Sequence, residues 1–224
     1  RKLRCGCTKI RKLIINEQEL IDGFADRESG EDKVVRGVIF MEQMSSGRLS
    51  EAIAFQIAEL ILSGQIESGT KLRQEELAKM LEVSRIPVRE ALQLLETQGL
   101  AKRLVTRHIV TADLDDVHVR ETYAMIAAME KNAIDAMVSE RGVAALQEYE
   151  GIRPDMEIHR MIIQRTANLY VQTLLTNAVN YYVQFAEKKK PQSTYTMHNV
   201  LQKWATEGES LLNEHYLILA ETVI

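Results

Sequence analysis

The sequence has little cysteine, proline, glycine or aromatic side chain: 2 Cys, 3 Pro and 11 Gly in 224 residues, with 5% aromatics. Two cysteines cannot build a disulfide framework, which favours a reducing compartment such as the cytoplasm. So few prolines and glycines exclude collagen-like and low-complexity chains. No apolar run reaches the roughly 18 residues that a membrane span needs, and the basic opening Arg1-Lys2-Leu3-Arg4 is not followed by the apolar stretch of a signal peptide. We therefore expect a cytoplasmic protein without a membrane partner.

Hydrophobic residues make up 46% of the chain and charged residues 27%, which indicates a helix-rich protein with a packed core. The length suits two modest domains. The net charge of −4 is unevenly spread, because residues 113–224 carry 16 acidic against 10 basic side chains. Residues 45–112 carry nearly equal numbers of acidic and basic side chains. That segment can present a basic face if its basic side chains gather on one side of the folded domain.

The periodicity of apolar residues along the chain predicts an extension over residues 1–48, a small domain over 49–112 and a helical domain over 113–224. The extension shows no sustained periodicity, and we expect it to be disordered or of cloning origin. Its Cys5-Gly6-Cys7 motif could ligate a metal, but no second pair completes a tetrahedral site. A terminal tail is the preferred interpretation.

Three helices and a hairpin are predicted in the small domain. Ser50 can cap a helix over 51–63, with apolar residues at helical spacing before Gly64. A short helix over 74–82 follows, and Ser84 can cap a third helix over 85–98, with Pro87 in its first turn. Two β-like stretches, 102–105 and 108–110, complete the domain.

A winged helix-turn-helix has this arrangement, two helices joined by a tight connection and followed by a strand pair. In that architecture the second helix enters the major groove of DNA, N-terminus first. Arg85 and Arg89 are four residues apart and share one helix face, away from the apolar stripe. Their guanidinium groups suit guanine edges or phosphate, and the open N–H groups after Ser84 can hold a phosphate. The alternative is that the two arginines merely solvate the helix, or that they pair with Glu90 and Glu96.

Basic residues also occupy the predicted wing, where a hairpin reaches the neighbouring DNA backbone or minor groove. They are Lys102, Arg103 and Arg107. We expect Arg103 and Arg107 to contact DNA.

The C-terminal half is predicted to be wholly helical, as an antiparallel bundle. The expected helices run from Asp116 to Gly142 and over 155–166, 168–187, 195–206 and 210–222. The helix over 168–187 is apolar on so wide an arc that we expect it to be buried centrally. Lys188-Lys189-Lys190 ends it as a solvated C-terminus.

Asp155 and His159 are four residues apart, hence on one helix face, and can share a metal ion. His198 and His215 can add imidazoles from other helices, which predicts a divalent site for Zn, Ni or Mn. One alternative is that Asp155 and His159 form a surface hydrogen bond and the bundle is a metal-free interaction module. A second is a metalloenzyme that activates water, but no general base is evident nearby.

The segment 83–92, Val-Ser-Arg-Ile-Pro-Val-Arg-Glu-Ala-Leu, with its flanks over 66–78 and 95–100, resembles the DNA-binding domain of the GntR family of bacterial transcription regulators. The resemblance covers about residues 50–112. It implies that Arg85 and Arg89 contact bases and phosphates within the motif that contains Ser84 and Pro87, and that Arg73 and Arg107 add further contacts.

Residues 113–224 resemble the all-helical effector domain of the FadR subgroup, the FCD type. Its signature of Asp, three residues, His and then Asn is present as Asp155, His159 and Asn168. The resemblance implies a metal held by Asp155, His159, His198 and His215, which also engages a small carboxylate effector. It further implies a homodimeric regulator, not an enzyme, that represses at a palindromic operator in double-stranded DNA and is released by its effector.

Overall fold

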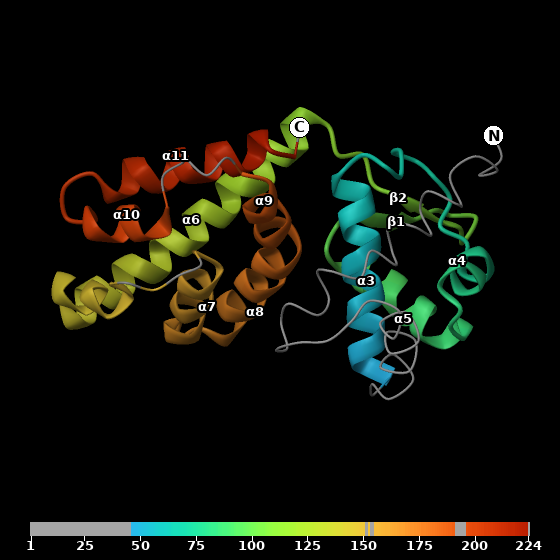
Figure 1. Ribbon diagram of the computed structural model, residues 1–224, viewed down its shortest axis with the longest axis horizontal. Coiled ribbons are helices and arrows are strands. Elements are labelled where there is room, and N and C mark those ends of the chain that lie inside the picture. Colours follow the sequence, from blue (N-terminus) through green and yellow to red (C-terminus); the bar gives the residue numbers. More distant parts are fainter. Residues whose placement is uncertain (1–45, 151, 153–154, 191–195, 224) are drawn as a thin grey trace, which may run out of the picture. The chain divides into compact units, whose positions relative to one another are not determined.

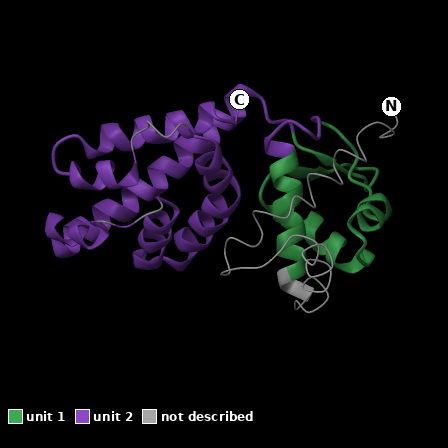
Figure 2. Ribbon diagram, viewed as in Figure 1, with its two compact units in different colours: residues 1–60, 69–112 green, residues 61–68, 113–224 purple. Residues whose placement is uncertain are grey.

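The protein is described from a computed structural model, which covers residues 46–150, 152, 155–190 and 196–223 (Figure 1). The chain divides into two compact units (Figure 2). The N-terminal unit contains residues 1–60 and 69–112, and the C-terminal unit contains 61–68 and 113–224. The predicted extension up to residue 45, including Cys5 and Cys7, lies outside the described residues.

Helix α3 (Ser46–Leu62) begins earlier than the sequence suggested. Ser50 was predicted to cap it, but the residue lies inside the helix, 3% exposed, and its hydroxyl donates to Glu90 of helix α5. The prediction was wrong because a serine can satisfy its hydroxyl across a helix pair as well as at a terminus. The predicted stripe is confirmed: Ile53, Ile57, Leu60 and Ile61 are all buried.

Helices α4 (Gln74–Leu81) and α5 (Arg85–Thr97) form a tight pair. Glu82 follows α4 in the left-handed conformation, φ 56°, and its N–H returns to the Ala78 carbonyl. This left-handed residue ends α4, and α5 begins after a connection of only three residues. The core side of α5 is apolar along its length, with Val88, Ala91, Leu92 and Leu95 all at 0% exposure.

Strands β1 (Ala101–Arg103) and β2 (Ile109–Thr111) pair antiparallel, with Lys102 opposite Val110. Lys71 adds a single bridge to Val110, so the chain between α3 and α4 joins the edge of the hairpin. The strands are shifted from the predicted ranges by one or two residues. This unit is a winged helix-turn-helix, as the sequence predicted.

The C-terminal unit is built around helix α6 (Asp116–Arg141), which Asp115 caps through the His118 N–H. Helix α11 (Gly208–Glu221) packs antiparallel along it (Figure 1). Ion pairs form near both ends of α11. Arg120 pairs with Glu221 and Lys131 pairs with Glu209, which is consistent with an antiparallel direction.

The remaining helices complete the bundle around α6. They are the 3₁₀ helix η1 (Val143–Tyr149), α7 (Asp155–Arg165), α8 (Leu169–Ala178), the π-helical η2 (Val179–Val183), α9 (Gln184–Lys189) and α10 (Met197–Gln202). Among the described residues, no helix is long and apolar enough to cross a bilayer. The predicted fold class, mainly helical with a winged helix-turn-helix followed by a helical bundle, is confirmed.

The segment predicted as one central helix over 168–187 is continuous helix, but its two halves differ. Leu169 and Tyr170 are 75% and 72% exposed, whereas Val179 and Val183 are fully buried. The prediction of central burial was therefore wrong for α8. Apolar composition alone does not tell which turn of a helix meets the core.

Candidate DNA interface and buried polar cluster

The outward side of α5 is cationic. Arg85 and Arg89 are exposed, one turn apart, while Val88 and Leu92 between and beside them face the core. The hydrophobic stripe therefore fixes the rotation of α5 and directs both guanidinium groups to solvent.

The two arginines differ in their ion pairs. Arg85 Nη1 lies 2.8 Å from Glu75 Oε1 of α4, and both side chains are largely exposed. Within the described part of the chain, Arg89 has no hydrogen-bond or ion-pair partner. The alternative pairing from the sequence is not observed, because Glu90 accepts from Ser50 and Glu96 pairs with Arg103 at 2.6 Å.

The N-terminus of α5 is open. Ser84 precedes it in extended conformation and its hydroxyl makes no capping hydrogen bond, while Ile86 in the first turn is 57% exposed. Backbone N–H groups of the first turn have no intrahelical acceptor, so they can donate to the oxygens of a phosphate. Pro87 is buried. It can shape this turn but offers no surface to a ligand.

The hairpin closes through a three-residue loop, Val105 to Arg107, with Leu104 N–H donating to the His108 carbonyl. Arg107 has φ 64°, a left-handed conformation that favours glycine. Its side chain is exposed, beside a Val105 that is fully exposed. The wing tip is therefore a projecting loop with one strained cationic residue.

Arg73 and Arg103 also lie on the surface of this unit. Arg73 precedes α4 and pairs with Glu76 at 2.9 Å, and Arg103 ends β1. Both guanidinium groups are thus partly neutralised by a carboxylate of the same unit.

A second cluster lies inside the C-terminal unit, where Glu130 of α6 is completely buried. Glu130 Oε1 lies 2.7 Å from His159 Nδ1 of α7, and its Oε2 accepts from the Tyr216 hydroxyl of α11 at 2.7 Å. The three helices therefore meet on one carboxylate. His159 Nε2 is buried and has no hydrogen-bond partner.

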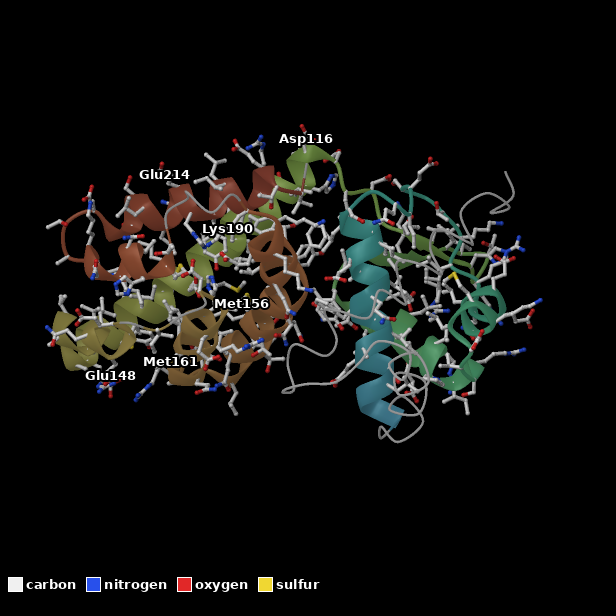
Figure 3. All side chains as sticks on the ribbon, in the orientation of Figure 1. Asp116, Glu148, Met156, Met161, Lys190 and Glu214 are labelled. Carbon is white, nitrogen blue, oxygen red and sulfur yellow. The ribbon has the colours of Figure 1, made fainter. Side chains whose placement is uncertain are left out.

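Beside this triad lies an acidic pair held by a lysine. Lys190 Nζ is 2.7 Å from Asp155 Oδ2 and 2.7 Å from Glu187 Oε2. Glu187 also approaches His215, with 3.3 Å between Oε1 and Nε2. Figure 3 labels Lys190 among the helices of this unit.

His159, Glu187 and His215 each offer one potential ligand atom, and these atoms lie within 4.8 Å of one another. Two of the four predicted metal ligands, His159 and His215, are thus brought together. Asp155 lies against Lys190, and His198 is outside the group. His198 stands in the first turn of α10, whose buried face consists of Met197, Val200 and Leu201.

The charges of the cluster are mutually stabilised. Burial raises the pKa of Glu130, but the positive charge of His159 and its hydrogen bond outweigh burial, so the pKa lies below its ordinary value. Burial lowers the pKa of His159, yet the Glu130 carboxylate raises it above its usual range. Burial likewise opposes ionisation of Glu187, while His215 and Lys190 lower its pKa to about 2.

Sequence reasoning missed Glu130, Glu187 and Lys190. Glu130 carried a signal, because it stands in register with the apolar residues Ile126 and Ile134 of α6, where a charge is costly unless it is paired. The prediction of a solvated lysine run is confirmed for Lys188 and Lys189, which are exposed, but is wrong for Lys190, whose side chain is 13% exposed and paired with two carboxylates.

Residues 49–109 match the family described as bacterial regulatory proteins, gntR family. Over 184 residues the chain is 26% identical to an uncharacterized HTH-type transcriptional regulator, YdhC, of Bacillus subtilis, a match that covers 74% of this chain and 77% of that protein. It is 32% identical over 95 residues to the gluconate operon transcriptional repressor of Bacillus subtilis, covering 42% of this chain and 39% of the repressor. The chain therefore matches less than half of that repressor.

A solved structure of Lar, described as controlling the expression of the Listeria monocytogenes agr system, is 19% identical. It covers 78% of this chain and 94% of its own, with a TM-score of 0.45.

Proposed function

Because this chain is a DNA-binding transcription regulator of the GntR family, we propose that it represses transcription as a homodimer on a palindromic operator, in the cytoplasm. The N-terminus of α5 enters the major groove, and the hairpin loop around Arg107 reaches the adjacent backbone. Two-fold symmetry of the protein then matches two-fold symmetry of the operator.

The observation that supports this proposal is the outward pair Arg85 and Arg89 on a helix whose opposite side is fully buried. Arg89 is the stronger candidate for direct contact, since Arg85 must exchange Glu75 for DNA. The other predicted contacts that are exposed, Arg73, Ser84, Arg103 and Arg107, belong to the same unit.

Selection of binding sites from a random double-stranded DNA library tests the proposal, followed by fluorescence anisotropy with the selected duplex. We expect an enriched inverted repeat, bound with an affinity that falls steeply as salt rises. Binding without sequence preference, or enrichment of a single half-site by a monomer, would contradict it.

The C-terminal unit, on this proposal, is an effector domain of the FadR subgroup and FCD type that binds a small carboxylate. An effector can release the protein from DNA only if it binds the released arrangement more tightly than the DNA-bound one. Isothermal titration with a panel of organic acids, with and without operator DNA, tests this. An acid whose affinity is the same in both states would not be the effector.

Residues of the buried cluster fit a divalent metal. His159 offers Nε2, which has no partner, while Glu130 accepts from Nδ1–H and so orients the ring as carboxylates do behind metal-bound imidazoles. Glu187 and His215 complete a set of two imidazoles and one carboxylate, which suits Zn, Ni or Mn. A bound ion would supply an electrophilic centre for an effector carboxylate.

Metal analysis of purified protein before and after chelation tests this site. We expect about one equivalent of metal per protomer and a melting temperature that falls when it is removed. His159→Ala should abolish uptake while DNA binding by the dimer persists. An unchanged metal content in that variant would refute the assignment and favour a metal-free interaction module.

A further inference from the structure

Lys190 is an unusual member of the buried cluster. Its side chain is only 13% exposed, and its two carboxylate partners, Asp155 and Glu187, are 5% and 8% exposed. Lysine is rarely buried unless it is paired. Here one ammonium group compensates two carboxylates that come from different helices, α7 and α9.

Glu187 belongs to two arrangements at once. Both of its oxygens lie close to the Lys190 ammonium, Oε2 at 2.7 Å and Oε1 at 2.9 Å, and Oε1 also lies 3.3 Å from His215 Nε2. The same carboxylate is the only acidic member of the group that could hold a metal ion in the described part of the chain. A cation bound by His159, Glu187 and His215 would therefore stand next to the Lys190 ammonium, and the two positive charges would repel each other.

Lys190 can leave without disrupting a helix. It directly follows α9, in extended conformation with φ −61° and ψ 146°, so its side chain is not confined by a further helical turn. Its long stem can carry the ammonium group to solvent while the methylene groups stay against the protein. Asp155 would then have no cationic partner among the contacts described for it, and its buried oxygen would be available as a ligand.

We propose that the Lys190 ammonium is an internal cation of this site, and that a divalent metal ion and Lys190 compete for the acidic pair Asp155 and Glu187. This inference rests on the proposed metal site. It explains why Asp155, which the sequence predicts as a ligand, is not part of the group of His159, Glu187 and His215: its carboxylate is paired with Lys190. Binding exchanges one buried cation for another, so the carboxylates stay compensated in both states.

The competition makes Lys190 a determinant of metal affinity. Replacing it by a neutral side chain leaves two buried carboxylates that lack their cation, which should weaken the metal-free fold and strengthen metal binding together. A residue that merely stabilises the bundle would affect stability alone.

The test is a zinc titration of the full-length, chelated protein by isothermal calorimetry, with bound metal measured after dialysis and melting followed in parallel. Lys190→Met is the main variant, and Lys190→Gln is a second in case the first does not fold. Lys189→Met is the control, because Lys189 is an exposed lysine in the same turn. We expect both Lys190 variants to bind zinc at least about tenfold more tightly than the parent, to melt lower without zinc and to gain more on adding it. Lys189→Met should match the parent.

Zinc uptake by the parent protein with equal or weaker uptake by both Lys190 variants would overturn the competition and leave the metal site intact. No uptake by any of the proteins at millimolar zinc would overturn both proposals. Uptake by the Lys190 variants alone would support the competition most strongly, because it would mean that the lysine excludes the metal.

Discussion

Arg85 Nη1 lies 2.8 Å from the carboxylate of Glu75, which joins the exposed side of α5 to the first turn of α4. Exposed pairs of this kind contribute little to stability. The pair matters for recognition instead, because it places a negative charge beside the surface that is proposed to meet a polyanion. Arg89 has no such neighbour among the described residues.

Glu75→Gln should strengthen operator binding, because it removes a charge that repels phosphate and releases Arg85. We expect a gain of about 0.5–1 kcal/mol at low salt, which shrinks as the salt concentration rises. Anisotropy titrations over a range of salt measure this. Glu214→Gln, an equivalent loss of charge in the C-terminal unit, should leave affinity unchanged. Weaker binding by Glu75→Gln would mean instead that Glu75 positions Arg85 for base contact.

Arg107→Gly distinguishes the effect of backbone strain in the wing from the effect of the positive charge there. Glycine adopts φ 64° without strain, so this variant should be more stable by about 0.5–1 kcal/mol. It should also bind DNA more weakly, because the guanidinium group is lost. Arg107→Ala is the matched control, since it loses the same group and keeps the strain. Equal stability of the two variants in urea denaturation would exclude strain at this loop.

Glu130→Ala should destabilise the C-terminal unit severely. The change leaves His159 and the Tyr216 hydroxyl without their shared acceptor in a fully buried place, at a cost of about 3–5 kcal/mol. Glu148→Ala is the control, because Glu148 pairs with Arg141 and Arg165 on the surface and should contribute far less. Urea denaturation of the chelated protein measures the free energy of unfolding of both variants. Similar losses of stability in the two would contradict the interpretation of the triad.

The acid sensitivity of the chelated protein should depend on Glu187. Its pKa is about 2 in the folded state against an ordinary value of 4.5. As the pH falls, the unfolded chain therefore protonates this carboxylate before the folded protein does. The stabilisation is complete above about pH 4.5 and is lost as the pH falls toward about 2, and the total is of the order of 3 kcal/mol. Glu187→Gln should flatten the free energy of unfolding over this window. A pH profile that is unchanged in Glu187→Gln would show that other carboxylates govern acid unfolding.

Much of the fold could be predicted from the sequence, because the hydrophobic periodicity agrees with the positions of the residues that begin and end helices. Ser84, Pro87 and Gly99 mark the ends of α5, and its buried residues recur at helical spacing. Ser50 misled the prediction because a hydroxyl can serve a neighbouring helix. The 3₁₀ segment from Val143 to Tyr149 was missed, since so short an element has no periodic signal of its own.

The buried cluster was less accessible to sequence reasoning. Spacing along one helix predicted that Asp155 and His159 share a face, and they do lie on the buried side of α7. Which residues complete the cluster depends on how separate helices pack, and no local pattern specifies that Glu187 rather than His198 joins His159 and His215. A pairing across helices is a tertiary property.

The central claim, that α5 presents Arg85 and Arg89 to double-stranded DNA, is tested most directly by the operator affinity of Arg89→Ala, measured beside Arg160→Ala, an exposed arginine of the C-terminal unit. We predict that Arg89→Ala weakens binding by about 1–3 kcal/mol with an unchanged melting temperature, and that Arg160→Ala binds as the parent does. Parental affinity of Arg89→Ala for the selected operator would contradict the account.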